Sequence, residues 1–577
     1  MELLKSLFIL FTFIAIAVHS QLTDESWWKT ANIYQISPLS FKDSDDDGKG
    51  DIKGIISKLD YFVETGINVL LITPFFETNM VDFAYDVTNY VKVDETFGTM
   101  SDIEELFAKA KEKNLRIILD FVPNHTSNRH EWFLNSEISV SEYENFYVWH
   151  DGIPQKNDGQ PLPPNNWTSE YGGSSWKWNA MREAYYYHKF AEAQPDLNLR
   201  EEKVIQKLNE VLKFWIDKGA DGFRINAVSQ LFEDAAFLEK SDIEINLPQT
   251  YELIERWRAL IDEYSSGKVL IPQVWNSPIA DLMRYYQNDD GSKQRAQIPM
   301  NFMLINELTA TSNASEFKRV IESYTSALPE GAIANWLLGS HDHNRVASRM
   351  GKEKIDGLMI LLQTLPGISF NFYGDEIGME DYMDISWEDT MDIQACNADQ
   401  NDFKRFSRDV ARTPFQWDNS TNAGFSSGKP WLPVNPSYIE NNLDAQIKTN
   451  RSHYKLFKEL LVLRKNETFI KGDLNIQALN TNVLGYSRSY NGNSFIIAIN
   501  LNNTHETVDA SVLNVKFGDE SEIYLASSDS SYNSGDIVNV KNLHLMPYDA
   551  VIIKYSSATK ITLSLLTAMM MIVKIFL

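Results

Sequence analysis

The chain has 577 residues, of which 43% are hydrophobic and 12% aromatic, a composition typical of a large packed protein with two or three domains. Its formal net charge of −26 and its isoelectric point of about 4.8 argue against nucleic-acid binding, because phosphate contacts need clustered Lys and Arg. The one cysteine, Cys396, excludes an intrachain disulfide.

Both ends of the chain carry patterns typical of processing signals. Residues 1–20 place Lys5 before an apolar run from Leu7 to Val18, which predicts a secretory signal peptide too short to span a membrane. Residues 557–577 form a hydrophobic tail, and the small residues at 556–558 precede an apolar run from Ile561 to Leu577. This pattern predicts a GPI-anchor signal, with a retained membrane helix as the alternative. We therefore expect the protein on the extracellular face of the plasma membrane, held there through its C-terminal tail.

Asn-x-Ser/Thr sequons agree with an extracellular chain, because they are the acceptor sites of N-glycosylation in secreted proteins. The predicted glycosylation sites are Asn166, Asn313, Asn419, Asn450, Asn466 and Asn502. A seventh sequon begins at Asn124, beside the predicted active site, where a glycan is not expected.

Short apolar stretches alternate with longer helical ones from residue 32 to residue 376, which predicts a parallel (β/α)8 barrel. Helices are expected at Ser101–Lys113 and Glu202–Lys218. The eight expected strands are Asn32–Pro38, Asn68–Pro74, Arg116–Val122, Gly222–Val228, Val269–Trp275, Asn301–Asn306, Asn335–Asp342 and Ser369–Glu376.

The sequence divides into a barrel, an insertion and a C-terminal domain. The interval between the third and fourth strands is rich in Trp, Tyr, Asn, Pro and Gly, which predicts an inserted subdomain over residues 126–195. The barrel then comprises residues 21–125 and 196–470. Residues 471–556 contain short strands and polar turns, including Asn491-Gly492 between two strands, and predict an antiparallel β-sandwich.

The loop from Asp43 to Asp51 carries acidic side chains at alternate positions around glycines. Such side chains can direct their oxygens onto a hard cation such as Ca²⁺, although a solvated acidic turn would have the same composition. We prefer the metal loop, with a structural role at the first barrel strand.

Residues 221–228, DGFRINAV, form a short apolar strand that carries Arg224 and ends in Asn226. In a barrel, such a strand end faces the active site. The stretch resembles the DGFRIDAV strand of the α-glucosidases, oligo-1,6-glucosidases and insect maltases of the α-amylase family, glycoside hydrolase family 13. Further family-like motifs follow in order, namely DFVPNHT at 120–126, QPDLN at 194–198, GSHDHNR at 339–345, YGDEIGM at 373–379, RTPFQW at 412–417 and NAGF at 422–425.

The resemblance implies which residues bind a glucoside and which bind a metal ion. It implies glucoside-binding roles for Asp86, His125, Arg224, His341 and Arg412. It also implies a structural Ca²⁺ bound by Asp43, Asp45, Asp47 and Asp51 and by the backbone carbonyl of Lys49.

The chain departs from the family at the two residues that perform hydrolysis. Asn226 stands where the family has its nucleophilic aspartate, and Gln273 stands where it has its acid/base glutamate. Asp342, at the position of the transition-state stabiliser, is retained. Retaining glycosidases need two carboxyl groups, and an amide can neither attack as a carboxylate nor donate a titrating proton. Ser229 and Gln230 are softer departures beside the nucleophile position.

We therefore expect a maltase-like protein that is catalytically inactive and acts as a cell-surface sugar-binding or partner-binding protein. An active α-glucosidase that hydrolyses maltose or sucrose is the alternative, and it requires replacement catalytic groups that the sequence does not show. An ancillary heavy subunit of an amino-acid transporter is a third reading. The amides fit either a natural non-catalytic member of the family or an engineered variant, and the intact signal and tail favour the natural chain.

Overall fold

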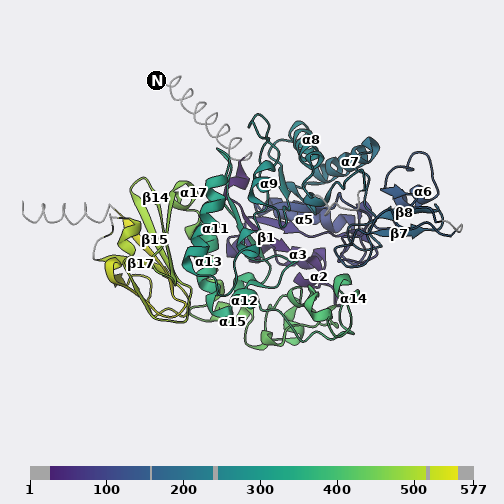
Figure 1. Cartoon of the computed structure of the whole chain (residues 1–577). Coiled ribbons are helices and arrows are strands. Elements are labelled where there is room, and N and C mark those ends of the chain that lie inside the picture. The colour runs from purple at the N-terminus through teal and green to yellow at the C-terminus, as the bar shows by residue number, and fades with distance from the viewer. Residues whose placement is uncertain (1–25, 156–158, 238–244, 515–516, 518–519, 557–577) are drawn as a thin grey trace, which may run out of the picture.

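The computed structural model describes residues 26–155, 159–237, 245–514, 517 and 520–556. The barrel lies in the middle of the molecule, with the C-terminal strands at one end and the inserted strands β7 and β8 at the other (Figure 1). The predicted signal peptide and hydrophobic tail lie outside the described residues. Within the described part, no helix combines the length and apolarity needed to cross a membrane.

The barrel is built on seven parallel strands in the order β10-β9-β5-β2-β1-β12-β11. Residues 298–301 bridge the two edge strands: the Ile298 and Met300 N–H groups donate to Leu270 and Pro272, and the Asn301 N–H donates to the Asn335 side chain. The sheet therefore closes, which confirms the predicted barrel. The strands are β1 (Asn32–Ile36), β2 (Val69–Ile72), β5 (Arg116–Phe121), β9 (Gly222–Ile225), β10 (Val269–Pro272), β11 (Asn335–Leu337) and β12 (Ile368–Phe372).

The sixth expected strand is wrong in position. The closing segment ends at Asn301, and the next residues form the short helix α10 (Met303–Asn306). The Asn301 side chain accepts a hydrogen bond from the Met303 N–H (3.0 Å), a local bond that competes with strand pairing and turns the chain. The other strands end one to five residues before their predicted limits.

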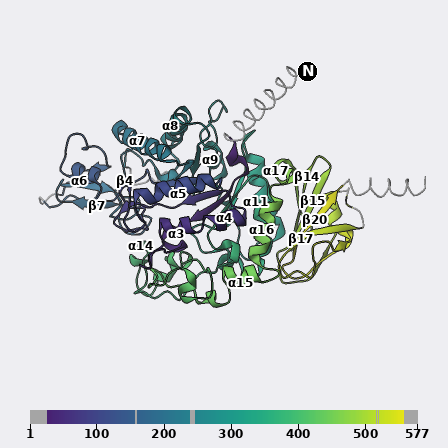
Figure 2. The same cartoon turned by 180° about the vertical axis from the view of Figure 1, so that it is seen from behind.

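Amphipathic helices surround the barrel, and their apolar stripes supply most of its core. Helix α7 coincides with its predicted span, and it buries Leu208, Leu212 and Trp215 before ending at Gly219, whose φ of 124° favours glycine. The covering helices are α4 (Leu59–Thr65), α5 (Met100–Glu112), α7 (Glu202–Lys218), α8 (Pro248–Tyr264), α11 (Ala314–Ala327), α13 (Ile355–Thr364) and α16 (His453–Leu463). Seen from behind, α3 (Ile52–Ser57), α4 and α5 lie on the near side of the barrel (Figure 2).

The insertion after β5 contains helix α6 (Glu131–Glu137) and a three-stranded sheet in the order β6-β8-β7. Its own aromatic cluster includes Trp167, Trp176 and Tyr187. The isolated bridge between His125 and Asp196 joins the two ends of the insertion at the barrel rim. The sheet comprises β6 (Trp149–His150), β7 (Trp176–Asn179) and β8 (Ala184–Tyr187).

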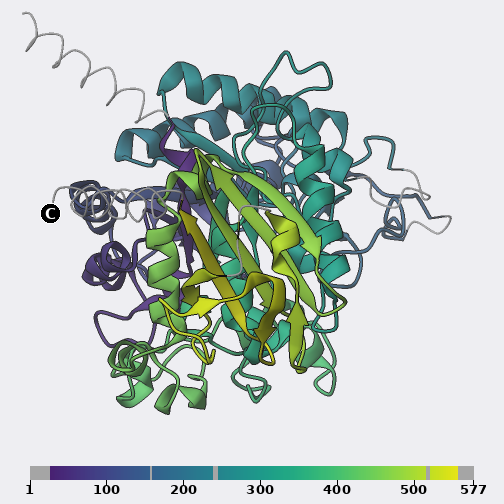
Figure 3. The ribbon, with the colours of Figure 1, turned by 90° about the vertical axis from the view of Figure 1, so that its left-hand side faces the viewer.

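The C-terminal domain is antiparallel, as predicted, with a six-stranded sheet in the order β13-β14-β15-β20-β17-β18 and a two-stranded sheet β16-β19. Strands β14 and β15 pair Tyr490 with Asn493 across Asn491-Gly492, whose positive φ angles suit a two-residue hairpin turn. The domain covers one side of the barrel (Figure 3). Its strands are β13 (Asp473–Ala478), β14 (Val483–Tyr490), β15 (Asn493–Asn500), β16 (Glu506–Val508), β17 (Ser521–Ala526), β18 (Ile537–Val538), β19 (Leu543–Leu545) and β20 (Ala550–Ser556).

Candidate functional site

The site begins where the parallel ladder ends, at the C-terminal rim of the strands. The Asn226 N–H donates to the Phe121 carbonyl (2.9 Å), and the Gln273 N–H donates to the Ile225 carbonyl (3.0 Å). These bonds continue the ladder one step beyond β9 and β10 and fix both backbones side by side. Ala227 then adopts a left-handed conformation (φ 49°, ψ 37°), a sparsely populated region for a residue with a Cβ.

The two amides contact each other directly. Asn226 Nδ2 donates to Gln273 Oε1 (3.1 Å), the Ala227 N–H donates to the same oxygen (3.3 Å), and Gln273 Nε2 donates to Asp342 Oδ2 (3.3 Å). The structure therefore brings the three predicted catalytic positions together. Retaining glycosidases hold their two carboxyl groups about 5–5.5 Å apart. Two carboxylates as close as these amides would repel unless they shared a proton.

Asp342 is held as a carboxylate by cations. Its Oδ1 accepts from Arg412 Nη2 (3.1 Å) and lies 3.5 Å from Arg408 Nη1. Burial raises the pKa of Asp342, but Arg412, Arg408 and Arg224 together hold it well below its usual range. A group so acidic stays charged at neutral pH, so it cannot serve as a proton donor.

His341 lies under this carboxylate in one defined tautomer. Gln35 Nε2 donates to Nδ1 (2.8 Å), which leaves the hydrogen on Nε2, 2.9 Å from the Tyr85 hydroxyl and 3.3 Å from Asp342 Oδ2. The Tyr85 and His341 rings are stacked, with centroids 5.6 Å apart. Burial lowers the pKa of His341, and the nearby Arg224 lowers it further, so the imidazole is neutral at pH 7.

Arg224 forms the buried ion pair of the site. Adjacent strands place it opposite Asp120, and its Nη1 binds Asp120 Oδ2 with both side chains almost fully buried. The Tyr85 hydroxyl donates to the same carboxylate oxygen (2.6 Å). Burial raises the pKa of Asp120 to about 6, although Arg224 opposes that rise.

The insertion completes the far wall. His125 Nε2 lies 3.3 Å from Gln194 Nε2. Burial lowers the pKa of His125 to about 4. Arg408 Nη2 binds Asp82 Oδ1 (2.9 Å), and the Tyr171 hydroxyl donates to Asp82 Oδ2 (2.9 Å). Asp82 thus joins Arg408 of the barrel to Tyr171 of the insertion.

Asp86 does not line the pocket, contrary to the expectation from the motif. Its carboxylate is fully buried and accepts from the Thr78 hydroxyl and from the backbone N–H groups of Asn79, Val81 and Asp82. Burial raises its pKa to about 6. Asp86 therefore shapes the loop, and Asp82, four residues earlier in the same loop, presents its carboxylate to the cavity.

The cavity has a volume of about 500 Å³. Sequence reasoning placed His125, His341 and the three catalytic positions here, and the lining contains them all, whereas Arg224 and Arg412 act from behind it. The sequence indicated that the insertion contributes to the pocket wall only through its high content of aromatic residues. Lining residues that were not predicted individually are Asp82, Tyr85, Glu170, Tyr171, Lys189, Phe190, Ala227, Gln230, Ile245, Trp275, Asn276, Gln394 and Arg408.

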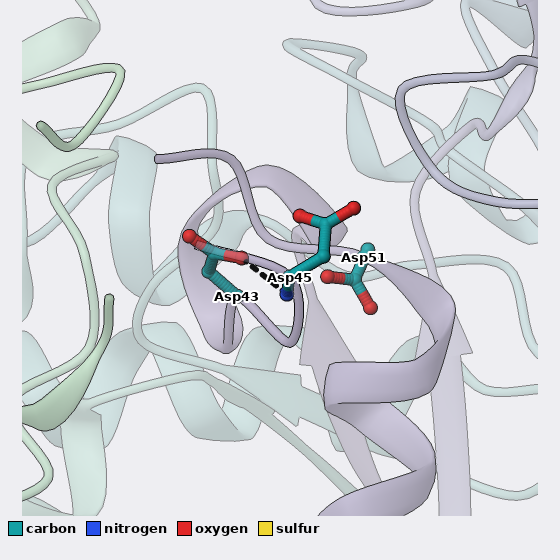
Figure 4. A group of neighbouring side chains, drawn as sticks. All are labelled: Asp43, Asp45 and Asp51. Carbon is teal, nitrogen blue, oxygen red and sulfur yellow. Dashed lines mark hydrogen bonds between the residues drawn. The ribbon is translucent and has the colours of Figure 1, made fainter. Parts of the chain in front are cut away.

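The acidic loop at the first barrel strand gathers three of its carboxylates (Figure 4). One oxygen each of Asp43, Asp45 and Asp51 lies within 4.8 Å of the others. Backbone N–H groups, including that of Gly48 (2.8 Å), orient the Asp43 carboxylate. The pKa of the exposed Asp45 is raised by partial desolvation and by repulsion from the neighbouring carboxylates. This oxygen set fits a hard cation such as Ca²⁺. Asp47 is exposed, outside the group of three.

The sequon asparagines differ in exposure. Asn166, Asn419, Asn450, Asn466 and Asn502 are exposed, and Asn313 is partly exposed. Asn124 is 2% exposed, and its Nδ2 donates to Asp196 Oδ2 (2.8 Å), so its amide is not accessible for a glycan.

Comparison with known families establishes the family to which the chain belongs. The model of the α-amylase catalytic domain matches residues 35–473. The chain belongs to the α-amylase family. Maltase 1 of Drosophila virilis is 44% identical over 508 residues, which cover 84% of this chain and 80% of that protein. Maltase A1 of Drosophila melanogaster is 40% identical over 553 residues, covering 90% and 95%. The human amino acid transporter heavy chain SLC3A1 is 33% identical over 557 residues, covering 92% and 78%.

Solved structures of this family agree on the fold. A trehalulose synthase MutB mutant in complex with glucose superposes with a TM-score of 0.82 at 29% identity, covering 92% of this chain and 99% of that one. An inactive double mutant of the same enzyme, with one Glu→Gln and one Asp→Asn substitution, gives a TM-score of 0.81 at 28% identity, covering 92% and 100%.

Proposed function

We propose that this α-glucosidase-like protein binds a glucosyl group in its pocket without hydrolysing it. The observation that carries the proposal is the direct Asn226–Gln273 amide contact of 3.1 Å. It fills the centre of the site with uncharged groups where a retaining mechanism needs a nucleophile and a proton donor. General acid–base catalysis alone contributes typically ~10²–10⁴-fold, and the covalent route is lost with the nucleophile.

Sugar binding is supported by the groups that surround the amides. His125, Asp82 and Asp342 present polar atoms to the cavity, while Tyr171 and Phe190 offer apolar ring surface. Sugar sites combine apolar walls with a few placed polar groups in this way. The glucose complex of the related trehalulose synthase mutant supports the same ligand class for this chain.

An active α-glucosidase remains the competing proposal, because the relatives named as maltases are 40–44% identical. It would need another nucleophile among the pocket carboxylates. Asp342, Asp82 and Glu170 each bind a basic side chain, which lowers the nucleophilicity of the carboxylate. A transporter heavy chain is supported by the relative at 33% identity, which is less similar than the two maltases.

The proposal is tested by restoring the carboxyl groups. Wild type should release glucose from maltose and sucrose at the background rate, and the Asn226→Asp/Gln273→Glu double variant should release it measurably, with retained anomeric configuration. Each single variant should stay near background, because nucleophile and acid act as a unit. Adding Asp342→Asn to the double variant should abolish the recovered activity. Robust turnover by wild type would refute the proposal.

We further propose that the chain is a glycosylated protein at the cell surface, with Ca²⁺ in the loop of Asp43, Asp45 and Asp51. The accessible sequon asparagines and the converging carboxylates support these two points. Removal of N-glycans should lower the apparent mass of the expressed protein. A phosphatidylinositol-specific phospholipase should release it from membranes, whereas retention after that treatment would argue for a spanning tail.

A further inference from the structure

The acidic residues that line the pocket already bind basic side chains of the protein. Three acidic residues of the described chain line it, and each has a basic partner: Asp82 binds Arg408, Asp342 binds Arg408 and Arg412, and Glu170 Oε1 lies 2.7 Å from Lys189 Nζ. Every carboxylate among the described lining residues thus has a basic neighbour, although Arg408 is shared with Asp392 (2.6 Å), and none is left without a partner for a positively charged ligand.

The amides at the centre do not supply that charge. Gln273 Oε1 already accepts from Asn226 Nδ2 and from the Ala227 N–H, and Gln273 Nε2 points a donor at Asp342. An ammonium group placed here would meet hydrogen-bond donors and three nearby guanidinium groups, those of Arg224, Arg408 and Arg412. Taking a cation out of water without a counter-charge is costly, whereas a hydroxyl needs only hydrogen-bond partners.

We propose that the pocket discriminates by charge: it accepts uncharged glucosides and excludes sugar-like amines. This inference rests on the proposed glucosyl-binding function and adds a consequence of Asn226 and Gln273 that is separate from catalysis. Hydrolysis needs both carboxyl groups, but the attraction of a cation needs only one. A single restored carboxylate should therefore change the ligand selectivity while leaving the protein inactive.

The experiment compares glucose with Tris, a small polyhydroxylated amine that is protonated at pH 7, by ligand-observed NMR and titration calorimetry. Wild type should bind glucose and show no Tris competition. Asn226→Asp and Gln273→Glu, each alone, should raise the affinity for Tris by about 10- to 100-fold, the range expected when a hydrogen bond gains a charged partner. Gln477→Glu makes the same charge change at an exposed residue of β13 and should leave Tris binding unchanged.

The outcomes separate the two proposals. Wild type that binds glucose and Tris equally well would overturn the charge selectivity while leaving sugar binding intact. Single variants with no gain in Tris affinity over Gln477→Glu would also overturn it. Wild type that binds neither compound, with Tris binding gained in the variants, would refute the glucosyl-binding function and the selectivity for an uncharged ligand with it. Rapid maltose hydrolysis by wild type would instead refute the loss of catalysis.

Discussion

The buried pair of Arg224 and Asp120 gives a stability prediction that depends on the structure alone. Asp120→Asn keeps the shape of the side chain but leaves the Arg224 guanidinium, which is 1% exposed, without its counter-charge. Breaking a buried pair in this way costs about 3–5 kcal/mol. With a slope of about 3 kcal/mol/M for a large domain, the urea midpoint should fall by about 1–1.7 M.

The assay is urea unfolding followed by tryptophan fluorescence and circular dichroism. Asp120→Asn/Arg224→Met should recover most of the lost stability, because removing both charges removes the uncompensated one. Asp444→Asn is the matched control, since it breaks an exposed pair with Lys448 and should cost within about 0.5 kcal/mol. A midpoint for Asp120→Asn equal to that of wild type would refute the reasoning, and so would a double variant as unstable as the single one.

Two further predictions concern the acidic loop and the ion pair between helices α13 and α16. Excess chelator should lower the melting temperature and Ca²⁺ should restore it, because Asp43, Asp45 and Asp51 repel one another without a cation; an unchanged melting curve would contradict the site. Burial opposes the charge of His453, but Asp356 Oδ1, 2.5 Å from its Nδ1, raises its pKa above the usual value. This stabilisation is complete below about pH 6.5 and is lost as pH rises through the folded pKa. His453→Gln should therefore lower the unfolding midpoint more at pH 6 than at pH 9, and an equal loss at both pH values would contradict the assignment.

The sequence predicted the fold where its patterns are local. The order of strands and helices followed from apolar periodicity. The Asn491-Gly492 turn predicted a hairpin, and the structure contains it, with Tyr490 paired to Asn493. The segment at 301–306 could not be placed, because the Asn301 side chain bonds the chain that follows it and a short apolar run fits either a strand or a helix.

The candidate site was predictable only for side chains that leave the strands directly. Asn226 and Gln273 stand one residue beyond β9 and β10, so their meeting follows from strand pairing. Asp82 and Arg408 are 326 positions apart in the chain, and only the packing of two long loops brings them together. Asp86 was assigned to the pocket from its motif, but four local donors bury its carboxylate, and no spacing rule distinguishes it from Asp82.

One NMR sample that contains the purified wild-type protein and maltose tests the central claim most directly. Binding without hydrolysis predicts saturation transfer from the protein to the maltose protons, together with maltose signals that stay constant over days and no growth of free glucose. Asn226 and Gln273 preserve the shape of the pocket for the sugar, but they do not supply the carboxyl pair that cleavage needs. Steady conversion of maltose to glucose, proportional to protein concentration and removed by Asp342→Asn, would contradict the account.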